Sequence, residues 1–165
     1  MAEEKWTGGC QCGAVRYELS VAPDNPCLCH CRMCQKQVAN AFGAWTGSHR
    51  DNFRVTRGAI AHFQSSADAL RGFCRNCGTP LTYEALSRPR IEVTIGSLDR
   101  HAEITPIRNI GVEAMQPWVA DIMHLPSTAS GEGDNGVGDT PARFDQIRQS
   151  NRQHPDHETE IWPPA

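Results

Sequence analysis

Short runs of alternating hydrophobic and polar residues dominate the first 126 positions of the chain. Val15, Tyr17 and Leu19 fall on one face of a predicted strand over residues 14–19, and Ile91 and Val93 do the same within residues 91–95. A period of two is typical of β-strands with one buried face. This pattern, with short apolar runs between turn residues, predicts an all-β fold with further strands at 27–31, 41–45, 53–56, 60–64, 70–74, 79–86 and 104–112.

Turns and short helical segments connect these strands in the prediction. Residues 23–26 are rich in turn formers, and Arg57 with Gly58 is expected to join strands 53–56 and 60–64 as a hairpin. Residues 35–40 favour a short helical turn. Residues 118–125 favour a short amphipathic turn that packs on the sheets.

The character of the chain changes after Pro126. Residues 127–141 hold four glycines and almost no large apolar side chain, which is typical of a linker. We therefore divide the chain into a domain at 1–126 and a linker with a C-terminal tail at 127–165, with a short helix over 142–150. His154, His157 and Trp162 in the tail are expected to be solvated, the alternative being that they dock near a metal.

Composition and charge exclude several classes of partner. The chain has 165 residues and a net charge of −3, and residues 127–165 carry seven acidic and three basic residues. Arg50, Arg54 and Arg57 are expected on a solvated strand face, so no nucleic-acid surface is predicted. No apolar run reaches membrane-spanning length and no signal peptide is recognised. We expect a cytoplasmic protein of undetermined oligomeric state that binds no membrane.

The most informative stretch is a cysteine cluster at positions 27–34. Cys29, Cys31 and Cys34 have a spacing that suits one metal ion, because residues two apart on a strand share a face and a turn returns the third thiol to them. Zn–S bonds of about 2.3 Å in a tetrahedron need sulfurs roughly 3.8 Å apart. Three protein ligands leave a fourth position free, which is typical of catalytic zinc.

Two further cysteine pairs flank this cluster. Cys10 with Cys12, and Cys74 with Cys77, are each followed by a glycine that permits a positive φ and lets backbone amides face thiolates. The two pairs supply four cysteines and the triad supplies three. This count predicts one closed, structural site from the two pairs and one open site from the triad. Other partitions exist, but each leaves cysteines without a role.

Three other interpretations of the cysteines were weighed. Disulfides are disfavoured in a cytosolic chain, and a thioredoxin-like motif needs a βαβ unit that the pattern does not show. Buried free thiols fit Cys27, which is expected to be a small core residue rather than a spare ligand. His30 points away from the triad on a strand, so we expect a structural or supporting role for it.

These motifs together resemble the glutathione-dependent formaldehyde-activating enzyme family, which also contains centromere protein V type proteins. The resemblance covers roughly residues 5–125. Where many relatives have a histidine before the final tryptophan, this chain has Asn109. The matching segments are Gly9-Cys10-x-Cys12-Gly13, Cys29-His30-Cys31-x-x-Cys34-Gln35-Lys36, Phe73-Cys74-x-x-Cys77-Gly78 and Gly96-Ser97-Leu98-Asp99.

The resemblance implies a β-tent fold stapled by zinc and two Zn²⁺ sites, a structural one on the paired cysteines and a looser one on the triad. It also implies a carbon–sulfur lyase that joins glutathione and formaldehyde as S-hydroxymethylglutathione. Arg32 and Lys36 flank the triad and are weak candidates for the glutathione carboxylates. The alternative functions are a non-catalytic zinc- or thiol-binding module and a protein-interaction platform on the same fold.

Overall fold

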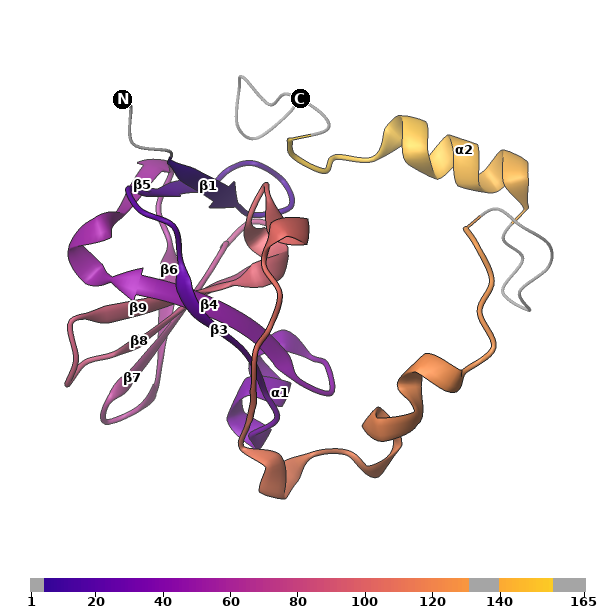
Figure 1. Cartoon of the computed structure of the whole chain (residues 1–165). Coiled ribbons are helices and arrows are strands. Elements are labelled where there is room, and N and C mark those ends of the chain that lie inside the picture. The colour runs from indigo at the N-terminus through magenta and orange to yellow at the C-terminus, as the bar shows by residue number, and fades with distance from the viewer. Residues whose placement is uncertain (1–4, 131–139, 156–165) are drawn as a thin grey trace.

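The computed structural model describes residues 5–130 and 140–155 and consists mostly of β-structure in two sheets. The first sheet has three antiparallel strands in the order β1-β2-β5: β1 (Trp6–Gly9), β2 (Arg16–Leu19) and β5 (Phe53–Arg57). The second has seven strands in the order β10-β3-β4-β9-β8-β7-β6 (Figure 1). Its strands are β3 (Asp24–Cys29), β4 (Gly43–His49), β6 (Ala61–Ser66), β7 (Ala69–Phe73), β8 (Pro80–Ala85), β9 (Arg90–Thr94) and β10 (Asn109–Ile110).

Neighbouring strands of the larger sheet are antiparallel, except that β10 lies parallel to β3. Helix α1 (Arg32–Val38) follows β3, and helix α2 (Pro141–Ser150) lies beyond the sheets. The expectation of an all-β fold with little helix is therefore confirmed. Helix α2 also agrees with the short helix expected at 142–150.

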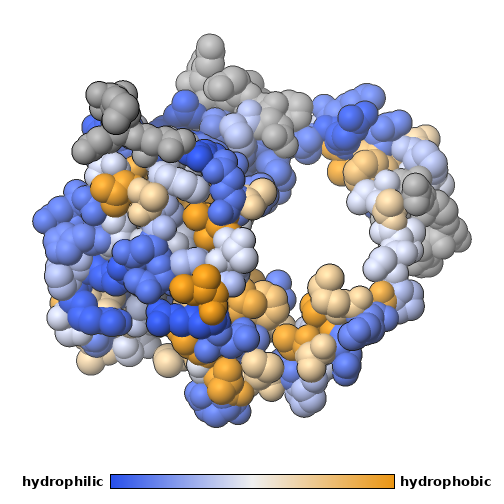
Figure 2. All heavy atoms as spheres, in the orientation of Figure 1, coloured by the Kyte–Doolittle hydropathy of each residue, from blue (hydrophilic) through white to orange (hydrophobic). Residues whose placement is uncertain are grey.

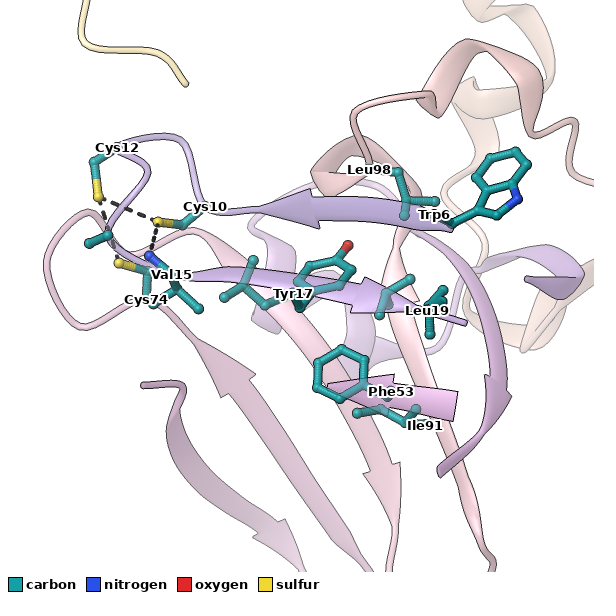
Figure 3. Packing of buried hydrophobic residues seen from close by; sticks show 13 residues of the cluster. Trp6, Cys10, Cys12, Val15, Tyr17, Leu19, Phe53, Cys74, Ile91 and Leu98 are labelled. Atoms are coloured by element: carbon teal, nitrogen blue, oxygen red, sulfur yellow. Dashed lines mark hydrogen bonds between the residues drawn. The ribbon is translucent and has the colours of Figure 1, made fainter. Parts of the chain in front are cut away.

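The main core joins the small sheet to the larger one. Tyr17 of β2 is fully buried, and its ring lies 5.2 Å from that of Phe53 on β5. Ile91 of β9 packs against the same cluster (Figure 3). The alternation in residues 14–19 and 91–95 thus marks the two faces that meet here.

The segment after β9 ties the small sheet down. Ser97 Oγ lies 2.7 Å from the Tyr17 hydroxyl in a buried hydrogen bond. Asp99 accepts hydrogen bonds from the Arg16 guanidinium, one of them at 3.0 Å, and from Thr7 Oγ1 at 2.6 Å. Ser97 and Asp99 therefore belong to a structural clasp between the turn and strands β1 and β2.

The predicted hairpin across Arg57 and Gly58 is wrong. Strand β5 pairs with β2 in the small sheet, whereas β6 pairs with β7 in the large one. The turn is present, but the chain uses it to pass from one sheet to the other. Burial of Phe53 against Tyr17 fixes the partner of β5, and a local turn signal does not contain that information.

Other boundaries also differ from the prediction. Strand β3 begins at Asp24 inside the expected turn, with a register irregularity around Asn25 at a φ of 52°. The strand expected at 104–112 is reduced to β10, and α1 begins three residues before the expected helical turn. Strand β1 was not predicted, because two of its four residues are glycines.

The 3₁₀ segment η5 (Pro117–His124) does not pack on the sheets as expected. Trp118, Ile122, Met123 and Leu125 are exposed, and Figure 2 shows hydrophobic spheres along the arc of this segment. None of the helices in residues 5–130 and 140–155 is long and apolar enough to cross a membrane.

The tail returns to the body at His154. Its backbone N–H donates a hydrogen bond to the Gln11 carbonyl at 2.7 Å, and its ring lies against Gly13, where a Cβ would be 3.0 Å away. The expectation of a solvated side chain is therefore wrong for His154, because the turn between Cys12 and β2 provides a surface on which it docks. His157 and Trp162 lie outside the described residues.

Candidate metal centres and the adjoining hollow

The four paired cysteines converge between the two sheets. Cys10 and Cys12 follow β1, while Cys74 and Cys77 lie between β7 and β8, and their four sulfurs are all within 4.8 Å of one another. The Cys10–Cys12 sulfur distance is 3.4 Å and the Cys12–Cys74 distance is 3.8 Å (Figure 3). Tetrahedral zinc requires roughly 3.8 Å between thiolates, so this donor set fits Zn²⁺.

Backbone and hydroxyl donors surround these sulfurs. The Val15 N–H donates to Cys10 Sγ at 3.2 Å, and Thr79 Oγ1 lies 3.1 Å from Cys77 Sγ. Burial acts to raise the pKa of Cys77, but hydrogen bonds from Thr79 and Cys12 together outweigh it and lower the pKa. Burial raises the pKa of Cys12 and of Cys74. Gly13 and Gly78 have φ values of 78° and 76°, as expected from their place after each pair. The donors at Cys10 and Cys77 would stabilise the thiolate form of these two ligands.

The triad also forms as a group of three sulfurs. Cys29 ends β3, Cys31 is the N-cap residue of α1, and Cys34 lies in the first turn of that helix. Their sulfurs lie within 4.8 Å of one another, with 3.4 Å between Cys29 and Cys31. Among the described residues no fourth His, Cys, Asp or Glu joins this group. A metal held here would keep one position for a substrate.

The triad borders a hollow of about 540 Å³ on one face of the seven-stranded sheet. Trp45 and Tyr83 form an aromatic wall, with ring centroids 6.4 Å apart, and both pack against the cysteines. The polar lining is basic, with one carboxylate among the described residues. It comprises Arg71 of β7, Arg88 before β9, Arg90 and Glu92 of β9, and Arg108 before β10.

Arg71 places a positive charge beside the triad. Its guanidinium lies over the Tyr83 ring at 5.2 Å and donates from Nη1 to Cys34 Sγ at 3.8 Å. Hydrogen bonds from Cys29 are the largest influence on Cys34 and lower its pKa, and Arg71 acts in the same direction. Arg71 is 6% exposed, so its positive charge acts in a partly desolvated environment.

Trp45 supplies a donor beside the same cysteines. Trp45 on β4 lies opposite Cys27 on β3. Its indole N–H lies over Gly43, which is itself opposite Cys29. The N–H is buried and has no hydrogen-bond partner in the part of the chain that the structure describes. A buried unsatisfied donor costs about 1–3 kcal/mol.

His30 and Asn109 lie behind the triad. His30 is 1% exposed, and its Nε2 lies 3.0 Å from Asn109 Oδ1, with Phe42 5.5 Å away centroid to centroid. Neither residue lines the hollow. Asn109 thus bonds His30 in the packing behind the site. Cys27 is buried and lines the hollow, but its sulfur is not part of the three-sulfur group.

Arg32 and Lys36 lie on the outer side of α1. They line a neighbouring hollow together with Met33, Gln37 and Phe63, and not the hollow that contains the three thiols. Arg32 also donates to Gln35 Oε1 at 3.3 Å. Their contact with a substrate stays a prediction.

Sequence reasoning missed the basic lining and Glu92. These arginines come from three separate places in the chain, and only the sheet order brings them together: Arg71, the neighbouring Arg88 and Arg90, and Arg108. The alternation of residues 91–95 indicates that Glu92 is on the face opposite Ile91. It does not indicate that this face is a hollow beside the cysteines.

Comparisons with known proteins agree with this architecture. Residues 5–114 match the family model described as glutathione-dependent formaldehyde-activating enzyme. An uncharacterized lyase of Schizosaccharomyces pombe is 27% identical over 79 residues, which cover 48% of this chain and 57% of that protein. A crystal structure of a Rhodobacter sphaeroides protein has a TM-score of 0.51 and 23% identity, covering 62% of this chain and 98% of the other, which supports the fold. Since the family model spans most of the chain, this protein belongs to the glutathione-dependent formaldehyde-activating enzyme family.

Proposed function

We propose that the protein is a zinc-dependent carbon–sulfur lyase that adds the thiol of glutathione to a small aldehyde such as formaldehyde, giving S-hydroxymethylglutathione. Family membership and the lyase name of the Schizosaccharomyces pombe relative support the reaction class. In this proposal Cys10, Cys12, Cys74 and Cys77 hold a structural zinc. Cys29, Cys31 and Cys34 hold the zinc at which the reaction occurs.

The observation that carries the proposal is a three-sulfur group bordering a basic hollow. Zn²⁺ bound there would favour the thiolate form of an incoming thiol and leave one coordination position for it. Arg88 and Arg108 line the hollow, and their side chains have no ion pair among the described residues. Glutathione carries two carboxylates and one ammonium group, so it is net negative. The hollow, with four arginines and one glutamate, is net positive and therefore complements it.

The chain's own residues have separable roles in this reaction. The arginines would bind the carboxylates and so orient the thiol toward the triad, because charge-assisted hydrogen bonds fix both distance and direction. Trp45 and Tyr83 exclude water from the inner wall of the hollow. Placing thiol and aldehyde side by side also removes part of the entropic cost of a two-molecule reaction.

Exchange spectroscopy with ¹³C-formaldehyde and glutathione tests the proposal, because it measures interconversion with S-hydroxymethylglutathione above the spontaneous rate. We expect wild-type protein to accelerate the exchange in proportion to its concentration. Cys31→Ser should lose one zinc per chain by elemental analysis and lose the acceleration. Cys27→Ser, in the same hollow but outside the triad, is the matched control and should keep both zincs.

Zinc content separates the two sites independently of turnover. Wild-type protein should contain two zincs per chain and fall toward one after dialysis against millimolar glutathione, because only the triad has an open position. Full acceleration by Cys31→Ser would contradict the assignment of the reaction to the triad. Wild-type protein that leaves the exchange at its spontaneous rate would overturn the proposed function.

A further inference from the structure

We propose that Glu92 is the proton-transfer residue of this site: it accepts the proton of the substrate thiol and returns it to the oxygen of the aldehyde. This inference deepens the proposed function and rests on it. Among the described residues, Glu92 is the acidic side chain in the hollow that borders the triad.

The sheet register places the Glu92 carboxylate over the neighbouring strand β4. Glu92 of β9 lies directly opposite Gly47 of β4, and β4 separates β9 from β3. A Cβ at Gly47 would collide with Glu92 Oε2 and lie 2.7 Å from its Cδ. The carboxylate therefore occupies the space that a side chain on β4 would fill. Gly47 lies opposite Asp24 of β3, and Cys27 lies opposite Trp45, two residues along β4 from Gly47.

The two carboxylate oxygens have different surroundings. Oε1 accepts a hydrogen bond from Arg90 Nε at 2.6 Å, which holds the group in place. In the described part of the chain Oε2 receives no hydrogen bond and lies over Gly47. One oxygen is thus fixed by the protein while the other is available to a ligand in the hollow.

The surroundings also permit Glu92 to hold a proton. Burial is the largest influence on this carboxyl and raises its pKa, and Arg90 opposes the rise without cancelling it. The other charged or titratable groups that line the hollow are Tyr83 on β8, Arg71 on β7, Arg88 and Arg108 on the adjoining segments, and the thiols of Cys27, Cys29, Cys31 and Cys34. Asp24 on β3 lies outside the hollow and pairs with Arg90. A raised pKa brings a carboxyl closer to the range in which it can both accept and donate.

The proposed proton cycle balances. The thiol S–H bond breaks and its proton passes to Glu92, leaving the electron pair on sulfur. Sulfur then forms a bond to the aldehyde carbon, the C=O π electrons move to oxygen, and Glu92 returns the proton to that oxygen. The product is a hydroxymethyl thioether, and Glu92 ends as the carboxylate it was at the start. Lyase turnover runs through the same steps in reverse.

A purely structural role makes different predictions, because Glu92 also belongs to an ion-pair network. Arg90 bonds to both Glu92 and Asp24. If Glu92 served only to hold Arg90, removing the charge of Asp24 would have a comparable effect. Asp24→Asn is therefore a matched control, since the Asp24 side chain is 60% exposed and does not line the hollow.

The experiment measures exchange kinetics of Glu92→Gln, Glu92→Asp and Asp24→Asn as zinc-loaded proteins, over a pH range in which zinc content is verified at each point. We expect Glu92→Gln to lose roughly 10²-fold in kcat with an unchanged KM for glutathione, the typical effect of removing an acid–base group. Wild-type kcat should fall as pH drops through the pKa of Glu92, and the Gln variant should lack this fall. Glu92→Asp should recover part of the rate, while Asp24→Asn should retain the wild-type profile.

Each outcome has a definite meaning. A Gln variant that binds two zincs and keeps both kcat and the pH profile overturns the role of Glu92 while leaving the proposed function intact. Equal losses in the Gln and Asp24→Asn variants also overturn it, in favour of a structural network. If the Gln variant does not fold, Glu92→Asp decides, because its shorter side chain withdraws the carboxylate from the ligand and a folded Asp variant with the full wild-type kcat contradicts the proposal. Absence of wild-type acceleration removes the proposed function and the inference together.

Discussion

Replacement of Asp99 by asparagine tests whether the Gly96–Asp99 segment stabilises the fold. Asp99 accepts hydrogen bonds from Arg16 and Thr7, and the side chains of Asp99 and Arg16 are only 22% and 13% exposed. Asp99 does not line the hollow beside the triad. We therefore expect Asp99→Asn to lower stability without changing catalysis.

The magnitude follows from the partial burial of the pair. Breaking a buried ion pair costs about 3–5 kcal/mol, but asparagine keeps one acceptor oxygen and this pair is partly solvated, so we expect a loss of about 2–3 kcal/mol. Burial acts to raise the pKa of Asp99, and hydrogen bonds from Arg16 and Thr7 outweigh it and lower the pKa. The stabilisation is therefore complete above the unfolded-state pKa of about 3.9 and is lost as pH falls through the lower folded-state value.

The assay is urea unfolding at neutral pH with a fixed excess of zinc, followed by far-UV circular dichroism. Glu103→Gln is the control, because Glu103 pairs with Arg100 on the surface and its loss should leave the midpoint unchanged. A loss below about 1 kcal/mol in Asp99→Asn, within the range of exposed pairs, would refute the argument that the clasp carries stability. A loss of kcat at equal folded fraction would refute its separation from the reaction.

Four other substitutions probe the two cysteine groups and the hollow. Cys74→Ser should lose one zinc per chain and its cooperative urea transition, whereas Cys31→Ser should lose one zinc and keep the transition. Gly43→Ala would place a methyl group on the Trp45 indole nitrogen, so we expect overpacking to cost about 1–3 kcal/mol in the same unfolding assay. Arg108→Ala should raise KM for glutathione roughly tenfold with kcat retained, which exchange kinetics would measure, because one charge-assisted hydrogen bond is lost.

The cysteine groups were predictable because their information is local. Cys29, Cys31 and Cys34 lie within six positions, and a strand followed by a turn brings their thiols together whatever the rest of the chain does. The two outer pairs were assigned to one another by counting. Their convergence in the structure agrees with that assignment, although the two pairs belong to different parts of the chain.

The hollow was not predictable, because its residues meet only through the sheet order. The Glu92 side chain extends over β4 because it lies opposite a glycine there, and a one-residue change of register would place it on the other face. The hairpin predicted at Gly58 is wrong for the same reason, because strand pairing depends on contacts far apart in the sequence. A turn sequence specifies a reversal of the chain, but the burial of Tyr17 and Phe53 decides which sheet each strand enters.

The four-cysteine group between the sheets also has a consequence during synthesis. Cys12 leaves the ribosome 62 residues before Cys74, the partner beside it in the folded protein. At about 5–20 residues per second, the first pair waits roughly 3–12 s before the second can join it. For that interval the nascent chain carries the thiols of Cys10 and Cys12 without the pair that completes their group. Zinc available early would protect those thiols, so growth in zinc-poor medium should increase oxidised, misfolded protein more than it lowers the rate of synthesis.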